Sequence, residues 1–353
     1  MFGSKKEIIG IDIGASAIKL VQLKESKSGY KLKALDLEAL PSEAVVDSSI
    51  MDSNTVVQAI RDLIVRNNLS KNAEVSIAVS GHSVIIRKIS LPLMTDEELD
   101  GSIQWEAEQY IPFDIADVYL DYQIVGPDPA DQGQMEVILV AARRDFINEY
   151  TGVIRESGLV PVVVDVECFA VENIYCSLYS DGLLDVVALI DIGASAAQLN
   201  ILKDNISVFT REIQMGGSAY NEELQKHFGL NNEDAEILKL SGSFEGVDSE
   251  EAHTVIDKVT DNLVQELARA LDFFSATFND EKVSKVYLTG GVCLTSGLMD
   301  KFEHSLEMPV ALLDPFSRIG VKESVFDLEF VKKSAPFYAV AAGLATRTFG
   351  DKI

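Results

Sequence analysis

The chain has 353 residues and a formal net charge of −26, with 47% hydrophobic and 24% charged residues. This balance is that of a globular protein long enough for more than one core, and it argues against disorder. The acidic excess argues against binding to nucleic acid backbones or anionic lipid surfaces, because both need clustered Lys and Arg.

The positions of the cysteines and histidines, together with the hydropathy of the sequence, exclude several further classes of protein. The three cysteines form no C-x-x-C pair and the four histidines do not cluster, so we expect neither a zinc site nor a disulfide framework. No apolar run approaches the length of a membrane span. Neither end of the sequence has the pattern of a signal peptide or of a membrane-binding amphipathic helix. We therefore expect no membrane anchor within this sequence.

The first 80 residues predict three strands, a helix and a fourth strand. The strands are expected over 8–13, 17–23, 30–40 and 75–79, where apolar runs are bounded by turn residues. The helix is expected over 53–67, because its apolar residues recur on one face.

Residues 83–159 change in character and predict a β-α-β-β-α unit. Strands are expected over 84–89, 118–125 and 135–140. Thr95–Glu98 has the pattern of a capping box, so a helix should begin there and stop before Pro112. A second helix over 145–157 should end at Gly158. We interpret this unit as a small domain inserted into a larger one.

The order of the opening elements then returns. A strand over 162–166 and a helix over 168–179 lead to strands over 186–192, 197–202 and 206–213. Helices are expected over 219–228, 232–240 and 249–279, the last long enough to be two. A strand over 285–288, a helix over 296–305 and a closing helix over 334–346 complete the chain. This order predicts two duplicated lobes.

The heptapeptide IDIGASA occurs at Ile11–Ala17 and again at Ile190–Ala196. A tight turn of small residues can point backbone N–H groups at a phosphate, and an Asp just before the turn can hold Mg²⁺ through its waters. Two facing copies could therefore grip a polyphosphate. A nucleophile elbow is an alternative, but the second glycine of G-x-S-x-G and a histidine partner are missing. A purely structural turn is the third interpretation. Walker A and G-x-G-x-x-G motifs are absent.

These motifs resemble those of the actin/Hsp70/sugar-kinase superfamily. IGIDIGASAIK at 9–19, LIDIGASA at 189–196 and LTGG at 288–291 are similar to its phosphate-1, phosphate-2 and adenosine motifs. The resemblance implies an α/β actin-like ATPase fold with two duplicated, ribonuclease H-like lobes, nucleotide in the cleft, and an inserted α+β subdomain in lobe one. Lobe one would comprise 1–82, 160–185 and 335–353, and the insertion 83–159. Lobe two would comprise 186–218 and 265–334, with a small helical subdomain at 219–264.

The inserted segment narrows the resemblance. A β-rich insertion in this place resembles FtsA, a cell-division protein, but EAEQYIPF at 106–113 and the segment 140–173 resemble the PilM family of type IV pilus assembly. This implies a cytoplasmic, ATP-binding scaffold that is recruited to the inner membrane by the cytoplasmic N-terminal peptide of PilN. The surface near Trp105, Tyr110, Ile111 and Phe113 is a candidate for part of the peptide groove. Alternatively these residues, Trp105 above all, form the core of the insertion.

The resemblance also implies residue roles. Asp12 and Asp191 would coordinate Mg²⁺ through water. The phosphates would meet Gly14, Ala15, Ser16, Lys19, Gly193, Ala194 and Ser195. The nucleoside would meet Gly216, Gly217, Glu236, Lys239, Gly290 and Gly291. Lys19 could instead be a surface strand lysine, and Glu236 and Lys239 an ordinary solvated helix face.

The resemblance also implies a polar side chain that orients the attacking water for hydrolysis, at the start of the helix after strand 162–166. Asp165 and Glu167 are the candidates, with Glu167 better placed. We expect at most a slow ATPase, with nucleotide acting mainly as a clamp between the lobes. The alternatives are an ATPase or sugar-type kinase with true turnover and an FtsA-like cell-division protein.

Overall fold

Two five-stranded sheets of the same topology form the frame of the molecule, seen in a computed structural model that describes residues 7–27, 29–128, 131–179, 186–278 and 280–350. In each sheet three antiparallel strands are followed by two strands parallel to the first. The first sheet, in the order β3-β2-β1-β6-β10, contains β1 (Ile9–Ile13), β2 (Ala17–Ser26), β3 (Gly29–Ala39), β6 (Glu74–Val79) and β10 (Val160–Val166). The second, in the order β13-β12-β11-β14-β15, contains β11 (Val186–Ile192), β12 (Ala197–Lys203), β13 (Ile206–Ile213), β14 (Lys285–Thr289) and β15 (Val310–Leu312). The predicted duplication into two lobes is confirmed.

The central strands of both sheets are buried almost throughout. All five residues of β1 are buried, and β11 is buried except at Val186 and Asp191. Such continuous apolar runs are typical of strands covered on both faces. Asp12 and Asp191 each stand one residue before the carboxyl end of a central strand, which is the edge where open α/β sheets place their ligands.

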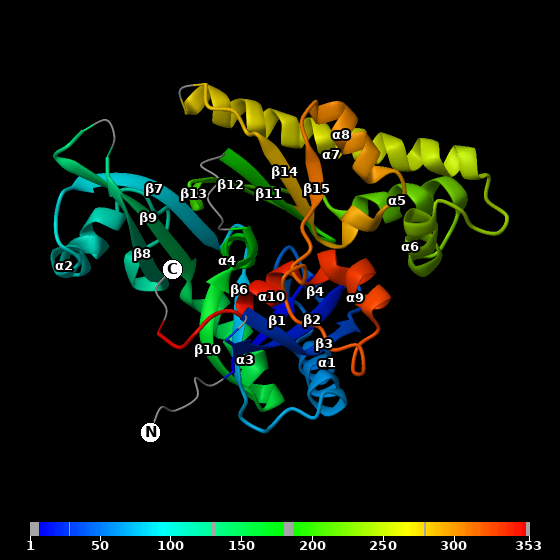
Figure 1. The fold of residues 1–353 in the computed structure, drawn as a ribbon, viewed down its shortest axis with the longest axis horizontal. Coiled ribbons are helices and arrows are strands. Elements are labelled where there is room, and N and C mark those ends of the chain that lie inside the picture. Colours follow the sequence, from blue (N-terminus) through cyan, green and yellow to red (C-terminus); the bar gives the residue numbers. More distant parts are fainter. Residues whose placement is uncertain (1–6, 28, 129–130, 180–185, 279, 351–353) are drawn as a thin grey trace.

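Two helices fill the space between the sheets. α4 (Glu167–Tyr179) and α10 (Ala339–Leu344) pack on each other, and their apolar residues share one core with residues of β2, β11 and β14 (Figure 1). A single closing helix was expected over 334–346. The chain instead forms α9 (Leu328–Ser334), a 3-10 turn (Ala335–Tyr338) and then α10, because Pro336 cannot donate the hydrogen bond that a continuous helix needs.

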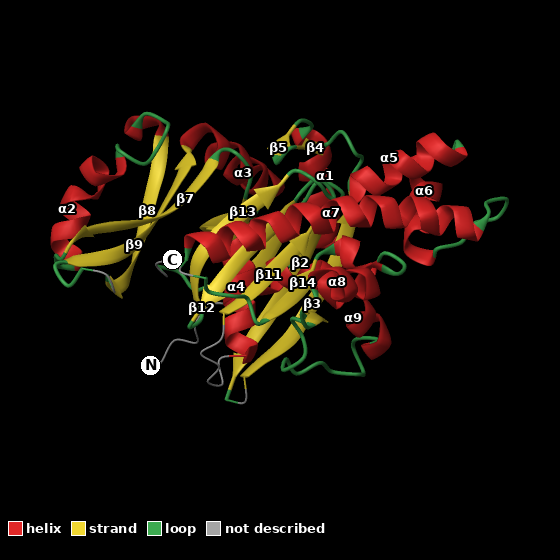
Figure 2. Cartoon of the chain, turned by 90° about the horizontal axis from the view of Figure 1, so that it is seen from above, coloured by secondary structure: helices red, strands yellow, loops and turns green. Residues whose placement is uncertain are grey.

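Lobe two carries its own layer of helices. These are α5 (Gly217–Phe228), α6 (Asn232–Ser241), α7 (Ser249–Thr277) and α8 (Leu298–Leu306), with a 3-10 turn at Gly291–Leu294. α7 is one continuous helix of 29 residues that lies across the second sheet (Figure 2). It passes through the expected boundary at 264/265, and one core joins both sides of that boundary. The expected end of the helix over 249–279 lies outside the described residues, and so do the expected ends of the lobe-one segments at 185 and 353.

The inserted unit is an antiparallel sheet in the order β7-β9-β8 with one helix against it (Figure 1). It contains β7 (Val84–Pro92), α2 (Asp96–Ala107), a 3-10 turn (Ile115–Asp117), β8 (Val118–Pro127) and β9 (Gln134–Arg143). The capping box at Thr95 and Glu98 is confirmed. The placement of Trp105 in this core is wrong: α2 turns Leu99, Ile103 and Ala107 inward, and Trp105, on the opposite face, is 74% exposed.

α3 (Arg144–Ser157) follows the inserted strands in the chain but packs elsewhere. It contacts α1 (Ser53–Arg66), and its apolar residues belong to the core of lobe one. Gly158 ends it in the left-handed conformation, as expected. The short hairpin of β4 (Val45–Val46) and β5 (Ser49–Ile50) lies in the same core. None of the helices among the described residues is long and apolar enough to cross a membrane.

Candidate functional site

Both copies of IDIGASA fold into the same turn. The N–H of Gly14 donates to the carbonyl of Ala17 at 3.1 Å, and the N–H of Gly193 donates to the carbonyl of Ala196 at 3.0 Å. The two turns lie at the carboxyl ends of β1 and β11 and face a common cavity of about 80 Å³. The predicted phosphate, metal and water-orienting residues that line this cavity are Asp12, Gly14, Ala15, Ser16, Lys19, Glu167, Asp191, Gly193, Ala194 and Ser195.

Lys19 is not a surface strand lysine. Its Nζ lies 2.8 Å from Oδ2 of Asp12, and its side chain is only 16% exposed. Burial acts to lower the pKa of the Lys19 ammonium, but the nearby Asp12, Asp191 and Glu167 outweigh it, so the pKa is raised. Lys19 therefore stays charged at the cavity wall.

Three carboxylates face this one ammonium. Burial, reinforced by Asp12, raises the pKa of Asp191 to about 6, although Lys19 acts in the opposite direction. Burial, together with Asp12 and Asp191, raises the pKa of Glu167 to about 8, while a hydrogen bond from Ser80 and the charge of Lys19 lower it. A site with excess carboxylate oxygens and turn amides fits a hydrated Mg²⁺ and phosphate, because the cation relieves the repulsion between the carboxylates.

The two candidates for orienting water are separated by the structure. Glu167, the first residue of α4, lines the cavity. Asp165 is 3% exposed and belongs to a structural network, with Asn173 at 3.2 Å and Arg347 at 3.5 Å. Glu167 is thus the residue of the two that can meet a ligand in the cavity.

The second turn is joined to the start of α5. The N–H groups of Gly217 and Ser218 donate to the carbonyls of Gly193 and Ala194 at 2.9 and 2.8 Å. A Cβ on Gly216 would lie 2.5 Å from the oxygen of Gly193, so only glycine allows this approach. The first turn of α5 and the second IDIGASA turn therefore form one hydrogen-bonded unit.

The predicted nucleoside residues gather beside that unit, outside the cavity. Lys239 is paired with Glu236 at 2.6 Å, and its side chain is 4% exposed, so it is not part of a solvated helix face. Glu236 remains 42% exposed and also accepts a hydrogen bond from Asn221 at 2.9 Å. The Nζ of Lys239 lies 3.2 Å from the position that a Cβ on Gly217 would take.

Gly290 and Gly291 lie between these nucleoside candidates and Asp191. Gly290 has a φ of 89°, and a Cβ there would lie 2.5 Å from Oδ1 of Asp191. Gly291 faces the ring of Phe337 instead, and a Cβ on Gly291 would lie 2.7 Å from Cε1 of that ring. Gly290 is therefore the member of the pair whose backbone lies close against the carboxylate of Asp191.

Sequence reasoning missed four polar residues that line the cavity. Gln198 occupies the position in the second repeat that Lys19 occupies in the first, so aligning the two repeats could have found it. Each pairs across its hairpin with the aspartate, Lys19 with Asp12 and Gln198 with Asp191. The others are Ser48, Ser80 and Tyr150, for which the sequence carries no motif.

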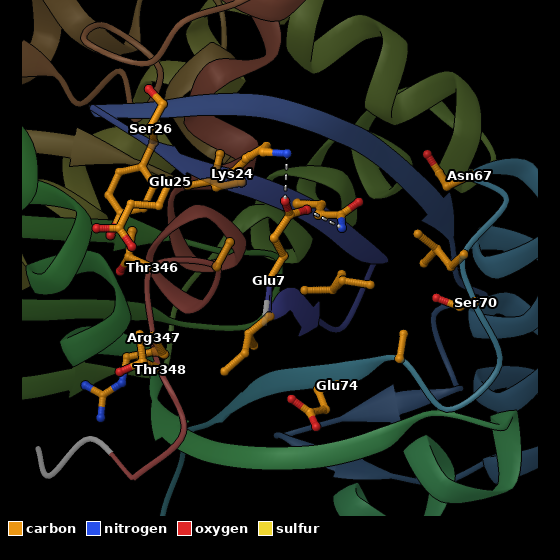
Figure 3. Close-up of a pocket in the computed structure, with 18 of the residues that line it drawn as sticks. Glu7, Lys24, Glu25, Ser26, Asn67, Ser70, Glu74, Thr346, Arg347 and Thr348 are labelled. Atoms are coloured by element: carbon orange, nitrogen blue, oxygen red, sulfur yellow. Dashed lines mark hydrogen bonds and ion pairs between the residues drawn. The ribbon is translucent and has the colours of Figure 1, made fainter. Parts of the chain in front are cut away.

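A much larger cavity, of about 1020 Å³, lies at the other end of the lobe-one sheet (Figure 3). It is lined by the start of β1, the end of β2, the segment 67–74 and the segment 345–348, and it contains none of the predicted site residues. Acidic and basic side chains are mixed here, and Glu7 pairs with Lys24 at 3.7 Å and with Gln22 at 3.2 Å. Its charge therefore favours neither an anion nor a cation.

Duplicated lobes with facing turns at a shared cavity define an actin-like ATPase fold with an extra subdomain. The chain belongs to the family of type IV pilus assembly protein PilM, whose family model matches residues 10–349. A solved PilM–PilN type IV pilus biogenesis complex contains a chain that is 29% identical, with a TM-score of 0.86 over 97% of this chain and 98% of that one.

Two further structures share the fold alone. The ethanolamine utilization protein EutJ from Carboxydothermus hydrogenoformans is 16% identical, with a TM-score of 0.60 over 97% of this chain and 89% of that one. MreB5 of Spiroplasma citri bound to ADP is 13% identical, with a TM-score of 0.52 over 96% and 94%.

Proposed function

We propose that this chain is an ATP-binding scaffold of the type IV pilus inner-membrane assembly platform, which binds the cytoplasmic N-terminal peptide of PilN. The observation that carries the proposal is the full-length likeness to the PilM–PilN complex, which includes the inserted subdomain. The chain would act in the cytoplasm and reach the inner membrane through its partner.

The nucleotide would bind between the lobes. Asp12 and Asp191 would hold Mg²⁺ through water, and Lys19 and the two glycine turns would meet the phosphates. The nucleoside would lie against the unit formed by α5 and α6, with Glu236 and Lys239. Packing supports a division in which the insertion spans 84–143, because α3 shares the core of lobe one.

Nucleotide binding would be linked to movement of the lobes. The cavity of about 80 Å³ is well below the roughly 300–1,000 Å³ of typical small-molecule sites. The cavity would therefore take at most the phosphate end of a nucleotide, and phosphates held by turns from both lobes would favour closure of the lobes.

Turnover would be slow. Glu167 is the one of the two candidates for orienting water that lines the cavity. Nucleotide would act mainly as a clamp between the lobes, and not as the substrate of a rapid ATPase or a sugar-type kinase.

Titration calorimetry with Mg²⁺–ATP tests the nucleotide site. Asp12→Ala combined with Asp191→Ala should abolish binding, because the remaining site loses both metal-facing carboxylates. Asp300→Ala, an exposed position on α8, serves as the control and should bind like the unaltered chain. Equal affinity of the double variant and the control would refute the clamp.

A further inference from the structure

The chain enters and leaves the inserted subdomain through two connections that lie side by side. The segment 80–83 leads from β6 into β7, and β9 leads directly into α3. The N–H of Arg143 donates to the carbonyl of Ser83 at 3.1 Å, and Val84 pairs with Ala142 in the first register position of β7 and β9. The subdomain is thus attached to lobe one by a two-stranded stalk.

Both connections of this stalk end at the candidate nucleotide cavity. Ser80, directly after β6, lines the cavity and is 7% exposed. Tyr150, on the second turn of α3, also lines the cavity and is 2% exposed. A rotation of the subdomain would therefore act on the cavity wall through two separate segments.

Ser48 joins the two segments. Its Oγ lies 3.2 Å from Oγ of Ser80, and its carbonyl accepts a hydrogen bond of 2.9 Å from the hydroxyl of Tyr150. Asp47 and Ser48 form the two-residue turn between β4 and β5, with φ values of 47° and 61°, as in the tight hairpin turns that resist deformation. A Cβ on Gly81 would lie 3.1 Å from Cβ of Ser48, so the stalk has little room to slide past it.

We propose that Ser48, Ser80 and Tyr150 are positioning residues that couple the orientation of the inserted subdomain to the nucleotide cavity. Ligands of the two regions then change each other's affinity, although the core of the subdomain is separate from that of lobe one. The inference rests on the proposed function for the identity of the two ligands.

The physical basis is that a turn of the stalk strains the two contacts of Ser48. Movement of β7 acts on Ser80 through the short segment 80–83 and strains its contact with Ser48. Movement of β9 acts on α3, which follows it without a linker, and strains the hydrogen bond from the hydroxyl of Tyr150 to Ser48. A nucleotide that holds the cavity wall in place thus favours one orientation of the subdomain, and a peptide that favours this orientation stabilises the same cavity. Such coupling is reciprocal by thermodynamic necessity.

The test is a coupling factor, the ratio of Mg²⁺–ATP dissociation constants measured without and with saturating PilN N-terminal peptide. The full chain should give a factor of about five or more. Tyr150→Phe should bring it to within about twofold of one, and Ser80→Ala should do the same. Tyr122→Phe is the matched control, since this hydroxyl is also in a buried tyrosine (6% exposed) but bonds to Asp96 within the subdomain, at 3.2 Å; it should keep the original factor.

A mere loss of stability would not move this ratio, because both constants refer to folded protein. If both ligands bind the full chain with a factor of one, or if Tyr150→Phe and Ser80→Ala keep the original factor, the coupling is overturned while the proposed function stands. If Mg²⁺–ATP or the peptide does not bind the full chain at all, the proposed function fails and the coupling falls with it.

Discussion

Lys19 and Gln198 hold equivalent positions in the two repeats but make different contacts. Lys19 is paired with Asp12 within its own hairpin, whereas the amide of Gln198 donates to Glu212 on the next strand, which also accepts from Gln214. The first repeat therefore carries a carboxylate balanced by an ammonium, and the second a carboxylate beside a neutral side chain. At the residue scale the first lobe therefore presents an ammonium paired with a carboxylate to the cavity, and the second lobe presents a carboxylate beside a neutral amide. Under the proposed function the ammonium would meet phosphate and both aspartates would hold the metal.

A second residue-scale feature is a polar network between the lobes. Glu172 on α4 accepts a hydrogen bond from Asn200 on β12 at 2.9 Å, and Ser207 on β13 donates to Asn200 at 2.7 Å. Burial raises the pKa of Glu172 to about 7, although hydrogen bonds from Asn200 and Ser207 act to lower it. The carboxyl group thus retains its proton in the folded chain at pH values where the unfolded chain has lost it.

This network predicts a pH dependence of the free energy of unfolding. The folded state binds more protons than the unfolded state between the unfolded pKa of 4.5 and about 7, so the stability contribution present below pH 4.5 is lost as pH rises through 7. The shift corresponds to at most about 3 kcal/mol. Urea unfolding of Glu172→Gln should show a smaller decline from pH 5 to pH 8 than the unaltered chain.

Glu98→Gln is the control for that measurement. Hydrogen bonds from Thr95 lower the pKa of Glu98, so its contribution changes only at more acidic pH, and the decline from pH 5 to pH 8 should be unaltered. Identical declines for Glu172→Gln and the unaltered chain would show that Glu172 is ionised in both states.

At the scale of elements, the crossing of α4 and α10 sets how closely the two five-stranded sheets approach. A Cβ on Gly343 of α10 would lie 1.8 Å from the carbonyl oxygen of Ala170 on α4. The two backbones are therefore in contact, and the core that lies between the two sheets includes residues of both helices.

Gly343→Ala should destabilise the chain by about 3 kcal/mol or more, because a methyl group there forces the helices apart. Gly152→Ala is the matched variant: it too is a helical glycine, on α3, but no atom lies within 4 Å of its added Cβ. It should stabilise by about 0.5–1 kcal/mol through helix propensity. Urea unfolding of both variants measures the difference, and a destabilisation of similar size in both would contradict a role for the close contact.

At the scale of the whole molecule, the inserted subdomain is a separate unit on a narrow attachment. Its core is distinct from that of lobe one, but Ile138 and Val140 of β9 also pack against Val166, Cys168 and Phe169. Separate cores joined by a small shared cluster allow the subdomain to change orientation without unfolding either part.

Replacing residues 84–142 by Asn-Gly should leave a chain that folds. The ends of the deletion are already hydrogen-bonded neighbours at Ser83 and Arg143, and Asn-Gly suits a two-residue turn. The melting temperature should fall, because the apolar side chains of β10 and α4 become exposed. Mg²⁺–ATP binding should persist in calorimetry and PilN peptide binding should disappear. Peptide binding by the shortened chain would place the peptide site outside the inserted subdomain.

Local pattern and the repeated heptapeptide were enough to predict the duplicated lobes, most elements and the two facing turns. Strand and helix periodicity reflect burial on one or two faces, and identical heptapeptides in matched settings fold alike. The predicted ends of several elements were less accurate, and the break of the closing helix at Pro336 was not predicted. The packing of α3 on lobe one could not be predicted, because in the sequence α3 directly follows the inserted strands.

What only the tertiary structure decided is which distant side chains share the cavity. Ser48 bonds to Ser80 across 32 residues and to Tyr150 across 102, distances over which no local pattern operates. The exposure of Trp105 and the burial of Lys239 were settled in the same way. The sequence by itself determined the strands and turns, because these depend on near neighbours; the cavity and the stalk depend on how complete lobes pack, and that is a property of the folded chain.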